Sequence, residues 1–338
     1  MGCRSVLALL AVGVLCTMPG QATGTVNLLK PAAAAGGAHL ADLQNADGGW
    51  FFLADDTDCG AGAGVSCPNT LGVTALGLLQ AYRLSRVPDL RTAAVYSADA
   101  LLDRHLSDPT CDGDAATDAD RPFSSDIVFL WEISRATGLP KYRTAAREWF
   151  NCVTQDFPDA AARADHRIDG RIAQGLDNLG PWDAAFDIRA ALRIPRLKSY
   201  ALAEITRILD RQSNWDDDSL VACPGCALLS KAHLLLAMAP VKRATSQIKA
   251  KTAEFVAFLV AAQHPDGSWM GGDTQITAYA VLGLQPYATT RDLKNAIDRA
   301  VAFLLFERKN ADGGFDDGFG EEVTEVDAEV LQALAAGP

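Results

Sequence analysis

The chain has 338 residues, of which 49% are apolar, so it can bury a sizeable core in one large domain or in two ordinary ones. Its formal net charge of −12 argues against nucleic acids and anionic membranes as partners, because both are themselves negatively charged. Beyond the N-terminal region, no stretch is apolar for long enough to cross a bilayer.

The N-terminus has the pattern of a secretory signal peptide. Arg4 precedes an apolar run from Val6 to Cys16, and Gly20 to Ala22 supply the small residues of a cleavage site. A membrane anchor is the alternative, but the run is too short to span a bilayer. We therefore expect residues 1–22 to be removed and one domain to span residues 30–338. The mature protein is expected to be secreted or periplasmic, and monomeric.

Six cysteines remain after this cleavage. An even number in an exported chain favours disulfide bonds over free thiols. Proximity in the loops suggests three bonds, although the sequence leaves other pairings open; the expected pairs are Cys59–Cys67, Cys111–Cys152 and Cys223–Cys226.

Apolar residues recur at helical spacing through most of the mature chain, and no segment shows the alternating pattern of a strand. One long loop, carrying His166, Arg167 and Arg171, is expected before the helix that Pro181 opens. The pattern predicts twelve helices, at residues 30–43, 69–83, 90–107, 124–135, 140–153, 181–192, 196–211, 226–239, 242–263, 274–284, 291–308 and 324–335.

These helices alternate in character. In each successive pair one helix is richer in charged residues, and the other is richer in Ala, Leu and Gly and begins near Ser, Thr or Asp. A helix that is apolar almost all round must be buried on most sides. Six buried helices inside six polar-faced ones predict an all-α fold, a single closed α6/α6 toroid, in which the inner N-termini surround one mouth of a central cavity.

Three similar turns separate outer from inner helices. Residues 44–50 read Gln-Asn-Ala-Asp-Gly-Gly-Trp and residues 263–269 read Gln-His-Pro-Asp-Gly-Ser-Trp, while residues 309–315 have Lys309 for Gln and Phe315 for Trp. The Gln amide can bond helix-end groups, Gly permits a tight exit, and the aromatic ring covers the seam between helix pairs. We call these three segments the plug turns, and we expect them to be structural.

The plug turns resemble the QW motif of the terpenoid-cyclase and protein-prenyltransferase superfamily. This resemblance implies the same toroid fold, but the catalytic signatures of that superfamily are incomplete here. Only Asp273 remains at the position of the class II Asp-x-Asp-Asp motif, and Glu325 stands where oxidosqualene cyclases have their leading Asp. The Zn²⁺ ligand set of prenyltransferases lacks its His, so no metal and no cofactor is expected.

Acidic and aromatic residues at the predicted mouth are the candidates for a site. Asp273, Glu325 and the nearby Asp327 are the candidate catalytic acids, because two carboxyl groups that share a proton can supply a general acid. The alternative is that such residues only cap helices, where Asp is favoured. The candidate ligand-binding residues are Asp126, Trp182, Asp183 and Tyr279.

Two classes of function stay open. The first interpretation is an exported toroid that binds a small-molecule, lipid or glycan ligand, or a partner, through its cavity. The alternative is an enzyme that uses the carboxyl groups at the mouth, either an isoprenoid cyclase or a polysaccharide lyase or glycosidase, since all-α toroids also host the latter activities.

Overall fold

The computed structural model describes residues 21–57, 59, 64–107, 123–174, 180–218 and 224–337. Within these residues the secondary structure is helical, and β structure is limited to isolated bridges. The α-helices are α1 (Gln21–Asp42), α2 (Leu71–Ser85), α3 (Pro88–Ser107), α4 (Ser124–Thr137), α5 (Pro140–Asp156), α6 (Ala160–Gln174), α7 (Pro181–Arg193), α8 (Lys198–Asp210), α10 (Cys226–Met238), α11 (Ser246–Ala262), α12 (Thr274–Leu284), α13 (Arg291–Glu307) and α14 (Thr324–Ala336).

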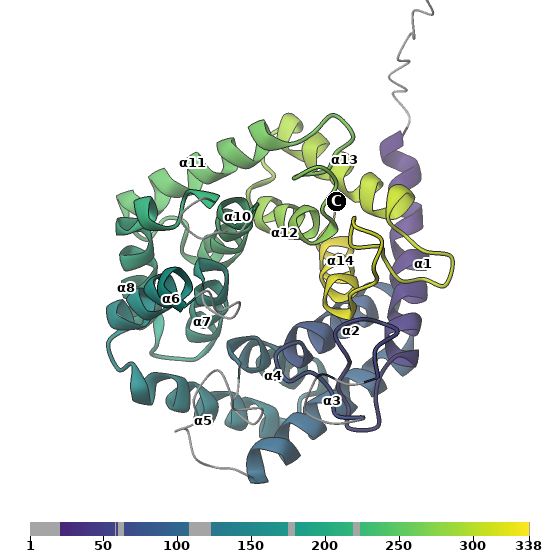
Figure 1. Cartoon of the computed structure of the whole chain (residues 1–338), viewed down its shortest axis with the longest axis horizontal. Coiled ribbons are helices and arrows are strands. Elements are labelled where there is room, and N and C mark those ends of the chain that lie inside the picture. Colours follow the sequence, from purple (N-terminus) through teal and green to yellow (C-terminus); the bar gives the residue numbers. More distant parts are fainter. Residues whose placement is uncertain are drawn as a thin grey trace, which may run out of the picture.

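Six of these helices form a closed inner ring. Going round it, α2, α4, α7, α10, α12 and α14 each contact the next, and α14 returns to contact α2. The helices α1, α3, α5, α8, α11 and α13 lie outside this ring (Figure 1). The predicted α6/α6 toroid is therefore confirmed.

Burial explains which helices are inside. In α12 every residue except Gln275 is buried, whereas α13 buries one stripe that includes Leu293, Ile297 and Val301. Small residues let the inner helices approach one another closely. A Cβ atom at Gly77 of α2 would lie 2.5 Å from the backbone of Ala328 in α14, so this contact has room only for glycine.

The two ends of the toroid are joined by hydrogen bonds just before α14. Thr324 donates its backbone N–H to the carbonyl of Phe52 at 3.0 Å and its hydroxyl to the carbonyl of Phe51 at 2.8 Å. Leu53 and Val323 form an antiparallel bridge beside them. The segment after α1 thus closes the ring against the segment before α14.

Two of the plug turns tie one outer helix to the next by hydrogen bonds. The Gln263 amide, at the end of α11, donates to the carbonyl of Ala296 in α13 at 2.8 Å, and the fully buried Trp269 indole donates to a carbonyl of α11 at 2.8 Å. Gln44 and Trp50 make the corresponding bonds to α3 and α1. These contacts agree with the structural role expected for the turns.

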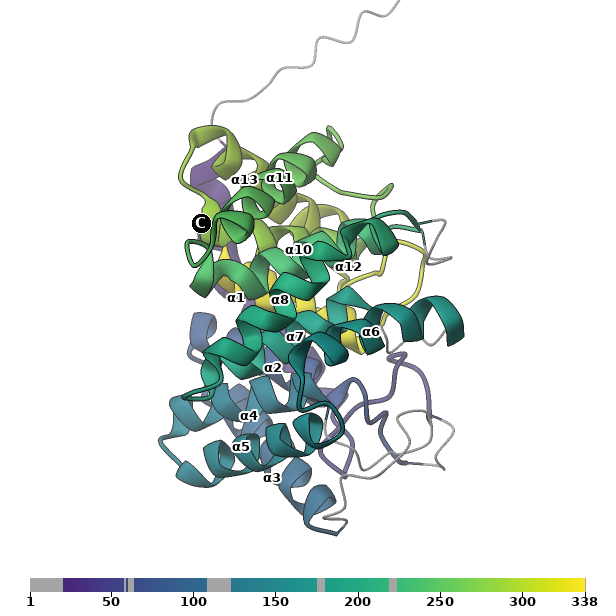
Figure 2. The ribbon, with the colours of Figure 1, turned by 90° about the vertical axis from the view of Figure 1, so that its left-hand side faces the viewer.

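The prediction of a long loop before Pro181 is wrong, because much of this segment forms α6. The Asp159 carboxylate accepts the backbone N–H of Ala161 at the start of this helix. Ala160, Ala164 and Ile168, spaced four residues apart, give it a buried face. This helix packs against α8 and α7 (Figure 2).

The predicted disulfide between Cys59 and Cys67 is present. Cys152 and Cys226 are disulfide-bonded as well. The cysteines predicted as their partners are Cys111 and Cys223, and both of these lie outside the described residues.

The expected signal peptide lies largely outside the described residues, which begin at Gln21 with α1. In the described part of the chain, no helix is both long and apolar enough to cross a membrane.

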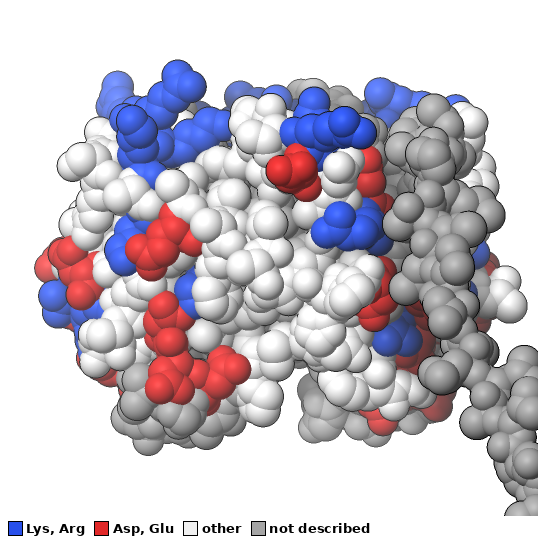
Figure 3. All heavy atoms as spheres, turned by 90° about the horizontal axis from the view of Figure 1, so that it is seen from above, with Lys and Arg blue, Asp and Glu red and all other residues white. Residues whose placement is uncertain are grey.

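Charge is distributed unevenly along the axis of the ring. Lys and Arg gather along one edge and Asp and Glu toward the other in Figure 3. Basic residues occupy the last turns of three inner helices, namely Arg83, Arg135 and Arg193, where a positive charge complements the helix dipole.

Candidate active site

A cavity of about 430 Å³ opens where the six inner helices begin. Every inner helix contributes to it from its first turn or from the two residues just before, and most contribute again one or two turns further in. The first layer consists of Asn69, Ser124, Ser125, Trp182, Asp183, Cys226, Gln275 and Glu325, and the second of Val73, Phe186, Leu229, His233, Tyr279 and Glu329; Phe52, Phe123 and Arg167 complete the lining.

Two glutamates from α14 form one wall. Glu325 and Glu329 are one helical turn apart, so both side chains face the cavity. Burial raises the pKa of Glu325 to about 7. Burial and the nearby charge of Glu325 raise the pKa of Glu329 well above its ordinary range, and the Gln275 amide donates to Glu329 Oε1 at 3.3 Å. This wall therefore offers a carboxylic acid that keeps its proton near neutral pH.

An imidazole and a phenol stack at the floor of the cavity. The rings of His233 and Tyr279 lie with their centroids 3.5 Å apart, and Phe186 meets His233 edge-on at 5.7 Å. Burial and then the nearby Arg189 hold the pKa of His233 well below its ordinary range, so the imidazole is neutral. Burial raises the pKa of Tyr279, whose hydroxyl lies beside Glu329.

The facing wall comes from α7, which stands opposite α14 in the inner ring. Trp182 and Asp183, both half-buried in the first turn of α7, line it. Arg167 reaches this wall from α6 and interacts electrostatically with Asp183. Among the described lining residues, Arg167 is the only one with a permanent positive charge.

Arg167 is held in place by a buried ion network. Arg163 and Arg167 each donate two hydrogen bonds to the Asp187 carboxylate, with Nε···Oδ2 distances of 3.0 Å, and Ser124 donates its hydroxyl to the same carboxylate. Although burial opposes its ionisation, the two guanidinium groups hold the pKa of Asp187 below its ordinary range. Burial and the Asp187 charge raise the pKa of Glu204, which lies beside this network.

Asp273, expected at the mouth, caps its own helix and does not line the cavity. Its Oδ1 accepts the backbone N–H of Ile276 at 2.8 Å, which is the geometry of an N-cap. Burial raises its pKa. The carboxyl group that shares a wall with Glu325 is therefore Glu329 rather than Asp273.

Asp327 and Asp126 also lie away from the cavity. Asp327 accepts the backbone N–H of Phe315 at 2.6 Å, and Asp126 accepts that of Phe123 at 3.0 Å. Burial raises the pKa of Asp126 to about 7, where its carboxyl packs against Gly72 of α2. Of the residues expected from the sequence, the structure brings together Glu325, Trp182, Asp183 and Tyr279 in the cavity.

Several lining residues are missing from the sequence-based set. Glu329 carries a signal that could have found it, because a second acid four residues after Glu325 on an apolar helix must share its face. His233 sits within a nearly continuous apolar helix, which also marks it as buried. Arg167 is harder to find, because its position depends on α6 and on Asp187, a partner 20 residues away.

No sequence-family profile and no curated protein matches the chain. Solved structures do share its fold. An unsaturated glucuronyl hydrolase specific for heparin is 12% identical, with a TM-score of 0.64 over 93% of this chain and 96% of its own. An inactive variant of the α-1,6-mannanase GH76A of Salegentibacter sp. HEL1_6, in complex with α-1,6-mannotetrose, is 9% identical, with a TM-score of 0.59 over 91% and 98%. A polysaccharide lyase is 11% identical, with a TM-score of 0.52 over 79% and 89%.

These likenesses correct the family that the plug turns suggest. The similar structures whose names state an activity are glycosidases and a polysaccharide lyase, so the resemblance to terpenoid cyclases and protein prenyltransferases is wrong. The physical reason lies in the turn itself. The amide bonds two outer helices and the aromatic ring covers the seam between them. Both contacts stabilise the toroid, whatever chemistry its cavity hosts.

Proposed function

We propose that this protein hydrolyses a glycosidic bond of a glycan bound in its cavity. The observation that carries the proposal is the carboxyl group of Glu325, whose pKa of about 7 lets it hold a proton up to neutral pH, on a wall opposite Asp183. A glycosidase needs one protonated and one ionised carboxyl group on either side of the scissile bond.

The two groups have distinct roles in this mechanism. Glu325 donates its proton to the glycosidic oxygen as the bond to the anomeric carbon breaks, so the leaving sugar departs as a neutral alcohol. Asp183, beside the positive charge of Arg167, acts from the other wall as the carboxylate that activates water or attacks the anomeric carbon. Water supplies the hydroxyl group of the new reducing end and restores the proton of Glu325.

The remaining lining suits a sugar chain. Trp182 and Tyr279 offer aromatic surfaces, while Asn69, Ser125 and Gln275 offer hydrogen-bonding groups. The likeness to toroids named as a glucuronyl hydrolase and a mannanase supports this ligand class at the level of the fold. These named activities favour the enzyme over the non-catalytic ligand-binding toroid at the level of the fold.

Elimination by a polysaccharide lyase is a second candidate, favoured by the pairing of His233 with Tyr279 inside the cavity. An imidazole next to a phenol offers groups that can remove the proton next to a sugar carboxylate and protonate the leaving oxygen, and hydrolysis does not require that proton removal. This reaction leaves an unsaturated sugar that absorbs ultraviolet light, whereas hydrolysis consumes water and creates no double bond.

We further propose that the protein works outside the cytoplasm. The N-terminal pattern of Arg4 and an apolar run supports export, and the Cys59–Cys67 disulfide fits an oxidising compartment. N-terminal sequencing of the protein secreted by its host should begin at Thr23. An intact Met1 on the mature protein would contradict export by cleavage.

The test is a panel of neutral and uronate-containing oligosaccharides incubated with the purified protein, with products followed by mass spectrometry and ultraviolet absorbance. We expect at least one glycan to gain the mass of water on cleavage. Glu325→Gln should lower this activity by about 10²- to 10⁴-fold, and Glu254→Gln, on the exposed face of α11, should retain it. Cleavage with a new ultraviolet chromophore would favour the lyase instead, and an unchanged Glu325→Gln would refute the role of Glu325.

A further inference from the structure

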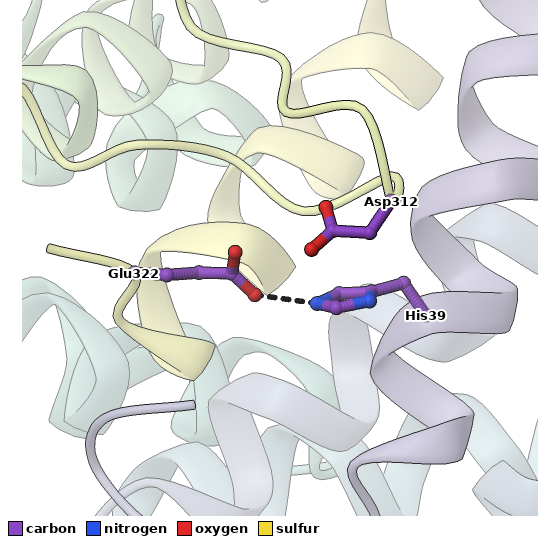
Figure 4. Close-up of side chains that lie close together, drawn as sticks. All are labelled: His39, Asp312 and Glu322. Carbon is purple, nitrogen blue, oxygen red and sulfur yellow. Dashed lines mark hydrogen bonds and ion pairs between the residues drawn. The ribbon is translucent and has the colours of Figure 1, made fainter. Parts of the chain in front are cut away.

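A histidine and two acids meet at the seam where the toroid closes. His39 comes from α1, and Asp312 and Glu322 come from the segment between α13 and α14 (Figure 4). His39 Nε2 lies 2.5 Å from Glu322 Oε1, and one ligand atom from each of the three side chains lies within 4.8 Å of the others. None of the three residues lines the cavity described above.

A fourth carboxyl group lies next to this cluster. Asp327 is 1% exposed and packs against the Glu322 carboxyl group. Its Oδ1 accepts the backbone N–H of Phe315, but no N–H or hydroxyl donor among the described residues reaches its Oδ2. A buried oxygen of this kind needs a proton or a cation. Asn310 orients the cluster by donating its amide to Glu322 Oε2 at 2.8 Å.

The other two plug turns have hydroxyl groups in the corresponding places. Asp47 accepts the hydroxyl of Ser66 at 2.5 Å, and Asp266 accepts that of Ser268 at 2.7 Å, so each carboxylate is satisfied within its own surroundings. Asp312, at the same position in the third turn, accepts the backbone N–H of Gly314 at 3.1 Å, and no hydroxyl group of the described residues donates to it.

The third turn instead makes room for a carboxylate. A Cβ atom at Gly314 would lie 2.5 Å from the Glu322 carboxyl group, just as one at Gly49 would lie 2.6 Å from Ser66. The place of the Ser66 hydroxyl in the first turn is thus taken by Glu322 in the third. Two acids and a histidine thus meet at the third turn, where the first turn has one acid and one hydroxyl group.

We propose that His39, Asp312 and Glu322 bind one divalent transition-metal ion of the Zn²⁺ class, which fastens α1 to the segment before α14. One imidazole nitrogen with two carboxylates is a ligand set that suits Zn²⁺, Mn²⁺ or Co²⁺, whereas Ca²⁺ and Mg²⁺ prefer oxygen ligands alone. Asp312 is exposed, so water completes the coordination from that side. With the ion bound, His39 and Glu322 move slightly apart, and their bonds to the ion replace their direct contact.

The ion acts as a clasp because its ligands are far apart in the sequence. His39 and Glu322 are separated by 283 positions, so an ion held by both links α1 to the segment just before α14. The unfolded chain does not present these ligands together, and binding therefore stabilises the folded toroid.

The experiment uses the full chain without a polyhistidine tag, stripped of metal with a chelator and titrated with Zn²⁺ by calorimetry. We expect one ion per chain and a Tm that rises by at least about 2 °C at saturation. Co²⁺ in place of Zn²⁺ should produce visible absorption bands that depend on His39. Failure to bind either ion at a one-to-one ratio would overturn the proposal.

A matched pair of variants locates the ion. Asp312→Asn keeps the hydrogen bond to its turn and removes one charged ligand, and Asp266→Asn makes the same change in a turn whose acid belongs to no such three-residue group among the described residues. Asp312→Asn and His39→Gln should each weaken Zn²⁺ binding at least about tenfold, while Asp266→Asn should bind as the unaltered chain does. Equal losses in the two Asn variants, or no loss in either, would place the ion elsewhere and overturn the proposal.

Discussion

Glu325 keeps its proton to about pH 7 because its carboxyl group is removed from water beside Glu329. If it is the general acid, the activity kcat/KM should fall as the pH rises above about 7, since the ionised form cannot protonate a leaving group. Glu325→Gln should lower activity by about 10²- to 10⁴-fold and remove this alkaline decline. A pH–rate profile measures both. If the alkaline decline survived in Glu325→Gln, a group other than Glu325 would be its cause.

The buried carboxyl group of Asp126 leads to a separate prediction about stability. Burial raises its pKa from 3.8 to about 7 in the folded protein, so its stabilising contribution is complete below pH 3.8 and is lost as the pH rises through 7. The pKa difference of about 3 corresponds to about 4 kcal/mol as an upper limit. Asp126→Asn, which can still accept the N–H of Phe123, should therefore be more stable than the original chain at pH 8 and similar at pH 4.

Urea unfolding at the two pH values measures this difference. A variant destabilised equally at pH 4 and pH 8 would show that the Asp126 carboxylate is required in its charged form.

At the scale of elements, α6 is the part of the site that depends most on one contact. Asp187→Ala would leave Arg163 and Arg167 buried without their carboxylate, and such a loss costs about 3–5 kcal/mol. Asp165, also on α6, pairs with Arg207 and Arg211 but is 31% exposed. Asp165→Ala should therefore cost about 1 kcal/mol or less.

Thermal unfolding and limited proteolysis of α6 compare the two variants. Asp187→Ala should unfold earlier and expose α6 to cleavage, and Asp165→Ala should behave like the unaltered chain. Similar behaviour of both variants would show that packing against α8, rather than the buried ion network, holds α6 in place.

The helix α6 also shows which part of the fold could not be predicted from the sequence. The inner helices could be predicted because residues such as Leu76, Ala278 and Leu331 belong to helices that are apolar on most sides. The buried face of α6 is made by small residues and by Arg163, whose burial is possible only because Asp187 neutralises it. A pattern of apolar residues along the chain does not record a partner on another helix.

The residues of the site likewise divide into those that the sequence could predict and those that it could not. Glu325 and Trp182 could be predicted because they begin inner helices, and all six inner helices begin at one mouth. Asp273 begins an inner helix too, but its side chain turns back to bond Ile276. The choice between capping and facing the cavity is decided by a side-chain rotation, for which the sequence has no signal.

At the scale of the whole molecule, ring closure should make unfolding cooperative. The contact between α2 and α14 and the hydrogen bonds of Thr324 to Phe51 and Phe52 leave no terminal helix pair at a free edge. Tryptophan fluorescence and circular dichroism should therefore report the same urea midpoint. Two separated transitions would show that the toroid unfolds in parts.

The central claim is that a glycan is cleaved between the walls of α14 and α7, and a crystal structure of Glu325→Gln with a glycan that the unaltered protein cleaves tests it most directly. We predict a sugar ring in the cavity, with its glycosidic oxygen within about 3 Å of the side chain at position 325 and Asp183 on the opposite face. A glycan bound on the outer surface, with the cavity unoccupied, would contradict the account.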